Sequence, residues 1–340
     1  MNTVAAVPFH IVSGFLGAGK TTLINRLLKA PELAGTLVIV NEFGEVGLDH
    51  WLYERLEGEV ALLTSGCLCC SLRGDLVETL KTLFERRDSG ALAPFSRVVI
   101  ETSGLADPAP ILHALIADPE LSRRLSLAGI VTLVDAANGL ATLEAHPEAR
   151  RQLALADVIS VSKRDLVGGV DALEARLDEI NPAALRLERI MPLDFLRPSL
   201  IAPAAHRASR LAAHGAGARA YSLSHDVPLG EAALSRFFGA VARLAGPKLL
   251  RVKGLVLTAG APNRPLVVEG AQHVVHAPRR LAAWPFQPAE TRLVAIVDGY
   301  TASEVGALWR ALTDAPEIDR PDLAALLENP LARRGGGLFD

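Results

Sequence analysis

The chain has 340 residues, of which 50% are hydrophobic and 21% are charged. This composition excludes a disordered chain, and the length is enough for roughly two domains. Lysine and arginine total 35 against 38 acidic residues, and the resulting net charge of -3 argues against nucleic acid as the main partner. The chain lacks the ~18 uninterrupted apolar residues of a membrane helix and the basic flank of a signal peptide. We therefore expect a cytoplasmic protein with no membrane partner.

The first two hundred residues alternate short apolar runs with helical patterns, as βαβ units do. The predicted strands are Phe9–Ser13, Leu37–Asn41, Val60–Leu63, Arg97–Glu101, Gly129–Val134, Val158–Val161 and Leu187–Met191. The predicted helices are Lys20–Lys29, Arg73–Arg87, Ala109–Ala117 and Asp171–Glu179. Because the strands are apolar along their whole length, helices are expected on both faces of the sheet. The sequence predicts a doubly wound α/β domain with a mostly parallel sheet over residues 1–200.

A change in composition marks the predicted domain boundary. Residues 201–218 are rich in alanine, glycine and arginine, which is typical of a linker. Beyond it, the predicted strands are Arg219–Leu223, Leu249–Leu257, Leu266–Val268, His273–His276 and Leu293–Val297. The predicted helices there are Gly230–Leu244 and Ser303–Ala311. This pattern predicts a smaller α+β domain over residues 219–315, followed by a tail at 316–340.

The segment from Gly14 to Thr21 matches the P-loop pattern of two glycines four residues apart, then lysine and threonine. In such a loop, backbone N–H groups surround phosphate oxygens, Lys20 reaches the outer phosphates and the Thr21 hydroxyl binds Mg²⁺. The following helix adds the positive end of its dipole. A simple glycine-rich turn is disfavoured because the match is complete and lies between a predicted strand and a predicted helix.

The segment Glu101–Gly104 follows a later predicted strand. Glu101 there can organise the water shell of Mg²⁺, and the N–H of Gly104 can sense the terminal phosphate. The alternative is that this segment caps the helix that begins after Pro108.

Residues Ser162–Asp165 have the spacing of a guanine-reading motif. Asp165 can accept the N1 and N2 hydrogens of guanine, whereas adenine presents an acceptor there, so the motif favours GTP over ATP. The usual asparagine at the first position is Ser162, which leaves the strength of this preference open.

All three cysteines fall in one short segment, at Cys67, Cys69 and Cys70. Three thiolates suit Zn²⁺ or another soft ion, and a tetrahedral site needs a fourth ligand. Loops after parallel strands gather at one edge of the sheet, so Glu42 is the first candidate, followed by Glu45 and His113. The alternative is that the cysteines are three small buried hydrophobic residues.

Five segments in one order resemble the CobW-like GTPases, relatives of the nickel-insertion GTPases HypB and UreG. They are Gly14–Thr21, Asn41–Gly44, Gly66–Asp75, Glu101–Pro108 and Ser162–Asp165. The resemblance extends over residues 219–312, which look like the family's C-terminal domain. It implies GTP binding, slow Mg²⁺-assisted hydrolysis, and delivery of Zn²⁺ or another transition metal to a client protein.

The resemblance also implies roles for individual residues. It carries the P-loop role to Gly14 through Thr22, metal binding to Cys67, Cys69 and Cys70, and base reading to Lys163 and Asp165. Together with the motifs themselves, the expected nucleotide-binding residues are Gly14, Gly17, Ala18, Gly19, Lys20, Thr21, Thr22, Ser162, Lys163 and Asp165, and the expected catalytic residues are Lys20, Glu101 and Gly104. We expect GTP to order the switch segment Asn41–Asp49 and so alter the metal ligands. Two alternatives are a P-loop metabolic kinase with structural cysteines and a nucleotide-gated adaptor for cobalamin-related or nitrile hydratase maturation. A homo-oligomer is compatible with all of these.

Overall fold

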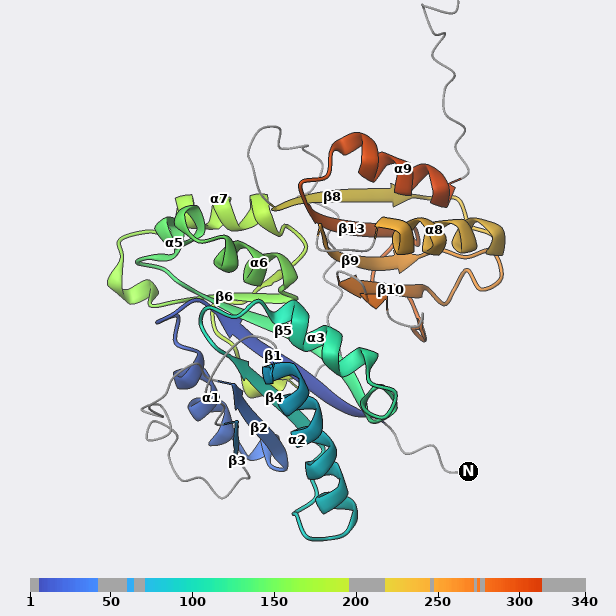
Figure 1. The fold of residues 1–340 in the computed structure, drawn as a ribbon. Helices are drawn as coiled ribbons and strands as arrows, with labels where there is room; N and C mark the ends of the chain where they lie inside the picture. The colour runs from blue at the N-terminus through green and yellow to red at the C-terminus, as the bar shows by residue number, and fades with distance from the viewer. Residues whose placement is uncertain are drawn as a thin grey trace, which may run out of the picture.

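The computed structural model describes residues 6–41, 60–63, 71–195, 218–244, 248–271, 274–275 and 279–313, which form two sheets with helices around them (Figure 1). The first sheet has the order β3-β2-β4-β1-β5-β6-β7, and all of its described strand pairs are parallel. Its strands are β1 (Val7–Gly14), β2 (Thr36–Asn41), β3 (Val60–Leu63), β4 (Arg97–Thr102), β5 (Leu125–Asp135), β6 (Val158–Ser162) and β7 (Leu185–Arg186). The loops after β1, β4 and β5 therefore meet at the centre of one sheet edge.

Helices cover both faces of this sheet. Along β1, Ile11 belongs to the core under α2 (Ser71–Asp88), α3 (Pro108–Ala117) and α4 (Leu121–Arg124). Its neighbour Val12 belongs to the core under α1 (Lys20–Leu28). Successive side chains of a strand point to opposite faces, so an apolar run is what a sheet covered on both sides requires. The predicted doubly wound α/β fold is confirmed.

The prediction missed two helices after β5 and misplaced the last strand. α5 (Gly139–Ala145) and α6 (Pro147–Leu155) are short, and Pro147 occupies the first turn of α6. The strand expected at Leu187–Met191 is wrong, because pairing with β6 ends within a few residues of Leu185. Ile190 instead packs in the core under α1, and its carbonyl accepts a hydrogen bond from Arg26 Nη2 at 2.7 Å. A further helix, α7 (Asp171–Ile180), follows β6 as predicted.

The second sheet has the order β11-β10-β9-β13-β8, with β12 beside β10, and its described strand pairs are antiparallel. The strands are β8 (Ala218–His225), β9 (Leu249–Val256), β10 (Leu266–Ala271), β11 (Val274–Val275), β12 (Arg279–Arg280) and β13 (Thr291–Asp298). The helices α8 (Glu231–Leu244) and α9 (Ala302–Thr313) cover one face (Figure 1). The predicted α+β pattern is confirmed, although β12 was not predicted. The predicted linker lies almost entirely outside the described residues, and the tail lies wholly outside them.

The other face of the second sheet packs against the first unit. Side chains of β13 alternate, so Ala295 joins the core under α8 and α9, whereas Val294 and Ile296 join the core formed by α5, α6 and α7. The contact between the second sheet and the first unit also includes charged side chains. Asp157, just before β6, accepts hydrogen bonds from Arg251 Nη2 at 2.5 Å and from Lys253 Nζ, both on β9. Burial raises the pKa of Asp157, but these two cations outweigh it and hold the pKa at about 2.

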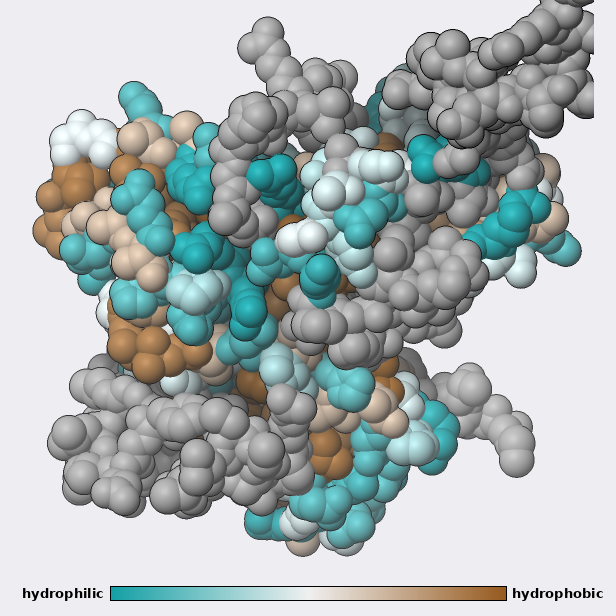
Figure 2. All heavy atoms as spheres, turned by 45° about the horizontal axis from the view of Figure 1, so that its top comes forward, coloured by the Kyte–Doolittle hydropathy of each residue, from teal (hydrophilic) through white to brown (hydrophobic). Residues whose placement is uncertain are grey.

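The surface shown in Figure 2 is largely hydrophilic where the structure describes it, with hydrophobic side chains in separate small patches. The exposed large apolar residues among those described are Leu16, Leu105, Leu166, Met191 and Val227. Within the described ranges, every helix is too short or too polar to cross a bilayer.

Stability is expected to fall in mild acid because of His10 on β1, which is 3% exposed. Burial, followed by the charge of Arg97, lowers the pKa of His10 from 6.5 to about 4, against an opposing effect of Asp157. Between these pH values the unfolded chain binds a proton that the folded chain does not. The stability linked to neutral His10 is fully present above pH 6.5. As the pH falls towards 4, the free energy of unfolding decreases by about 3 kcal/mol. Urea unfolding from pH 7.5 to 4 will show this slope, and His10→Gln will flatten it; an equal slope in both proteins would contradict the assignment.

Candidate functional site

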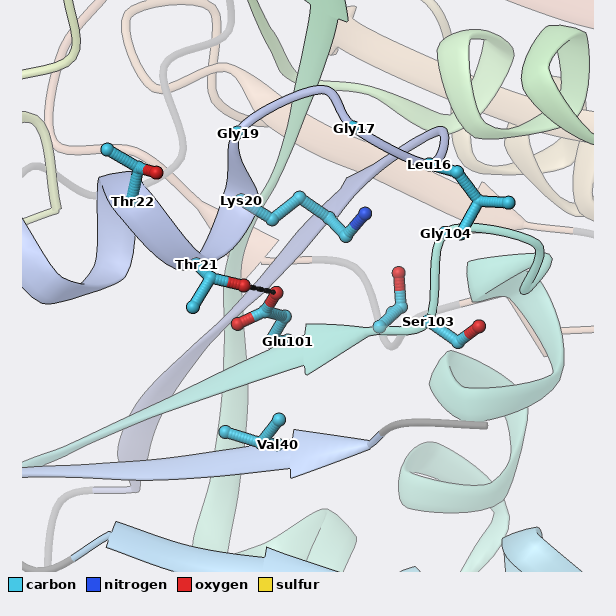
Figure 3. A pocket seen from close by; sticks show the side chains of 11 residues that line it. Leu16, Gly17, Gly19, Lys20, Thr21, Thr22, Val40, Glu101, Ser103 and Gly104 are labelled. Carbon is cyan, nitrogen blue, oxygen red and sulfur yellow. Dashed lines mark hydrogen bonds between the residues drawn. The ribbon is translucent and has the colours of Figure 1, made fainter. Parts of the chain in front are cut away.

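The loop between β1 and α1 curves around a cavity of about 300 Å³ at the carboxyl edge of the first sheet (Figure 3). Gly17 and Gly19 have φ of 74° and 94°, the left-handed region that favours glycine. A Cβ on Gly14 would lie 2.4 Å from the carbonyl oxygen of Leu133. The glycine spacing in the sequence thus reflects backbone geometry. The cavity is lined by Leu16, Gly17, Gly19, Lys20, Thr21, Thr22, Val40, Glu101, Thr102, Ser103 and Gly104.

The side chain of Lys20 extends beneath this loop toward Leu16 and Gly104 (Figure 3). It is 8% exposed, and its Nζ donates to the carbonyl oxygens of Gly14 at 2.8 Å and Phe15 at 3.1 Å. The ammonium is therefore held by neutral oxygens of its own loop. A cation in this position, with backbone N–H groups beside it, suits an anionic ligand.

Side-chain oxygens from α1 and β4, which could serve as metal ligands, meet on one side of the cavity. Thr21 Oγ1, in the first turn of α1, donates to Glu101 Oε1 at 3.0 Å, and Glu101 on β4 is 5% exposed (Figure 3). A hydroxyl and a carboxylate are hard ligands of the kind that Mg²⁺ takes, directly or through water. The donor set therefore fits this ion.

The loop after β4 lies directly against the P-loop. A Cβ on Gly104 would lie 2.7 Å from the backbone nitrogen of Leu16, so only glycine fits there. Gln152 on α6, which sequence reasoning missed, donates from Nε2 to the carbonyl oxygens of Gly104 at 3.0 Å and Ala106 at 2.9 Å. The capping alternative is not supported, because the N-cap of α3 is Asp107, which accepts from the N–H of Ala109 at 2.9 Å.

The expected base-reading segment also borders the P-loop. Ser162 Oγ donates to the carbonyl oxygen of Ala18 at 2.8 Å, and Lys163 Nζ donates to Asp135 Oδ2 at 2.8 Å. Burial raises the pKa of Asp135, but the hydrogen bond from Lys163 and others outweigh it, so this pKa lies below its usual value. Asp165 is exposed, in a 3-10 turn over Arg164–Leu166. Asp135 was also missed, although an acidic residue ending an apolar strand was a visible signal.

The expected metal ligands Cys67, Cys69, Cys70, Glu42 and Glu45 lie outside the described residues, as does most of the expected switch segment. The strands that lead into their loops are described: β2 and β3 are parallel neighbours, with Asn41 paired to Leu63. His113 lies in α3 and is partly buried. In the part of the chain that the structure describes, no three side chains of His, Cys, Asp or Glu come together as a metal site.

Comparison with known proteins gives two family matches. Residues 8–188 match the model described as CobW/HypB/UreG, nucleotide-binding domain, and residues 218–313 match that of the Cobalamin synthesis protein cobW C-terminal domain. The zinc chaperone YjiA of Escherichia coli is 32% identical over 287 residues, 82% of this chain and 89% of the relative. The zinc chaperone CobW of Pseudomonas aeruginosa is 38% identical over 145 residues, 40% of this chain and 37% of the relative. The crystal structure of Zn(II)-bound YjiA GTPase from E. coli superposes with a TM-score of 0.66 at 23% identity, over 91% of this chain and 99% of that one, and so shares its fold.

Proposed function

This chain belongs to the CobW/HypB/UreG family, and on that premise we propose that it is a GTP-hydrolysing metallochaperone. It binds Zn²⁺, or another transition metal, through Cys67, Cys69 and Cys70 and passes the ion to a client protein under nucleotide control. One observation carries the link between nucleotide and metal. Val40 of β2 lines the P-loop cavity, and Glu42 and the three cysteines follow β2 and its parallel neighbour β3 in the sequence.

The described residues suit the steps of GTP hydrolysis. The N–H groups of Gly17 and Gly19 and the ammonium of Lys20 bind the β- and γ-phosphates, and the Gly104 N–H faces the γ-phosphate. Thr21 and the water shell organised by Glu101 would hold Mg²⁺, which supplies neutralisation of phosphate charge. Lys20 and Thr21 are held before the reaction by hydrogen bonds, and Gly104 is held by close packing against Leu16. Such preorganised donors lower the barrier by stabilising charge as it develops on the transferred group.

The base side of the site supports a preference for GTP. Asp165 accepts two hydrogens from guanine, and Lys163, held by Asp135, lies two residues before it in the sequence. Ser162 stands where asparagine is usual, yet its hydroxyl ties this segment to the P-loop at Ala18. Binding of GTP, GDP and ATP measured by calorimetry with Mg²⁺ tests this step. Equal affinity for GTP and ATP would remove the base-reading role.

Nucleotide control of the metal is expected to appear as coupled affinities. GTP orders the segment after β2 and changes the ligands that Glu42 and the cysteines offer. The affinity for Zn²⁺ should then differ between the GDP form and a form with a non-hydrolysable GTP analogue by about 5–150-fold. By linkage, Zn²⁺ changes the GTP affinity by the same factor. Equal zinc affinity in both forms would overturn the coupling but leave GTP binding intact.

Replacing Cys67, Cys69 and Cys70 together with serine is expected to weaken Zn²⁺ binding by more than about 100-fold, because three of the four ligands are lost. Competition with a chromophoric chelator measures this affinity. Glu42→Ala tests the fourth ligand and should cost less, about tenfold, whereas His113→Ala should cost nothing. Binding of GDP to each variant shows that it is folded. A triple variant that keeps its zinc affinity would contradict the assignment.

A further inference from the structure

Gln152 is a buried residue that holds the loop after β4. It is 1% exposed on α6, and its single Nε2 donates to both Gly104 and Ala106. Its Oε1 is buried, with no hydrogen-bond partner among the described residues. Its own backbone carbonyl accepts from Thr132 Oγ1 at 3.1 Å, which fixes α6 against β5. The Gln152 side chain thus holds the loop through two backbone carbonyls of the loop. One of them belongs to Gly104, whose N–H is expected to contact a γ-phosphate.

The loop is also packed against the P-loop at Gly104. Gly104 already lies against the backbone of Leu16, so any movement of the loop changes the distance between the Gly104 N–H and a bound phosphate. Behind the P-loop is a second cavity of about 180 Å³, lined by Phe15, Leu16 and Gln152 among others. Gln152 therefore borders space that the described residues do not fill. A displacement of α6 would therefore reach the loop through Gln152.

The same helix is bonded to the second sheet at its carboxyl end. The carbonyl oxygen of Leu155, the last residue of α6, accepts from Arg251 Nη1 at 2.7 Å. The second terminal nitrogen of this guanidinium, Nη2, donates to Asp157, which immediately precedes β6. Arg251 therefore binds the end of α6 and the residue before β6 at the same time. Leu153 shares a core with Val294 and Ile296 of β13. Gln152 and Leu155 are less than one helical turn apart, which makes α6 a short, stiff connection.

We propose that α6 couples the Ser103–Asp107 loop to the C-terminal domain, with Gln152 as the positioning residue at the nucleotide end and Arg251 at the other. The coupling rests on the proposed GTPase function. A client or a metal-loaded segment that moves the second sheet changes the affinity for the γ-phosphate, and GTP in turn changes the position of that sheet. Binding at the two sites is reciprocal because both bias the same element.

The nucleotide end is tested with Gln152→Met, which keeps the length of the side chain but has no donor. Affinities for GDP and for a non-hydrolysable GTP analogue are measured by calorimetry. A positioning role predicts that the analogue binds at least about tenfold more weakly, while GDP, which does not reach Gly104, changes less than about twofold. A merely structural role would weaken both equally, and that result would overturn the proposal. If the unmodified chain binds neither nucleotide, the proposed function itself fails.

The other end is tested with Arg251→Lys, which keeps a positive charge near Asp157 but cannot span Asp157 and Leu155 together. We expect the ratio of GDP to analogue affinity to change by about fivefold or more. The matched control is Arg292→Lys on β13, whose guanidinium bonds Glu290 within its own domain; this ratio should stay constant. In the double variant with Gln152→Met, the effect of Arg251→Lys should disappear. Additive effects, or an unchanged ratio in the folded Arg251→Lys protein, would overturn the coupling.

Discussion

Replacing Lys20 with alanine is expected to lower the kcat of GTP hydrolysis by about 10²–10³-fold, the usual cost of one preorganised charge-stabilising donor. The ammonium is 8% exposed and already held by the carbonyls of Gly14 and Phe15, so it needs no reorganisation when charge develops on the γ-phosphate oxygens. In the alanine variant, water in a nearly closed loop replaces that cation. Phosphate release in a single turnover, at saturating GTP and Mg²⁺, measures the effect.

Two further variants separate charge from geometry. Lys20→Arg keeps the charge, but a planar guanidinium does not present it as a compact ammonium does, so this variant should lose nearly as much activity. Lys29→Ala removes an exposed lysine just after the same helix, away from the residues that line the cavity, and should keep full activity. A Lys20→Ala protein with unchanged kcat at saturating substrate would show that the cavity is not the catalytic site.

Features with a local physical cause were predictable from the sequence. The P-loop glycines are required by positive φ at Gly14, Gly17 and Gly19 and by close packing at Gly14, and these requirements leave a fixed spacing. The central strands are apolar because both faces are covered. The helix expected at Gly230–Leu244 is observed at Glu231–Leu244 because its apolar face repeats with helical period. Local pattern therefore located most strands and the parts of the candidate site next to the P-loop.

Features that depend on distant partners were not predictable. Nothing beside Gln152 in the sequence indicates the carbonyls of Gly104 and Ala106, which lie 48 and 46 residues away. The carboxylate of Asp157 is paired with cations more than 90 residues later. The predicted strand at Leu187–Met191 failed for the same reason, since the contact of Ile190 with α1 determines its path. Residues of this kind connect the two units, so sequence pattern alone did not reveal the coupling through α6.

Asp157→Ala is expected to lower the free energy of unfolding by about 3–5 kcal/mol, the cost of removing one member of a buried ion pair. Asp157 is 4% exposed, and its loss leaves the guanidinium of Arg251 buried without its carboxylate. It also removes the acceptor of the Ile130 N–H, bonded at 2.8 Å. Because the pKa of Asp157 is about 2 in the folded chain against 3.8 ordinarily, the native charge persists down to strongly acidic pH. Urea unfolding at pH 7.5, followed by circular dichroism, measures the change.

The matched control is Asp178→Ala, which breaks an ion pair with Arg186 of 2.9 Å at a more exposed site and should cost less than about 1 kcal/mol. A triple replacement of Asp157, Arg251 and Lys253 by leucine or methionine distinguishes desolvated charge from lost packing. If the cost of Asp157→Ala arises from the cations left behind, the all-apolar variant should recover part of the stability, because Arg251 and Lys253 are removed together with their carboxylate. Glu269, which Lys253 also pairs with at 3.7 Å, keeps Arg279 as a partner at 3.9 Å. If Asp157→Ala instead costs no more than Asp178→Ala, the ion cluster does not hold the two units together, and α6 must be anchored by its apolar contacts with β13 and by the hydrogen bond from Arg251 to Leu155.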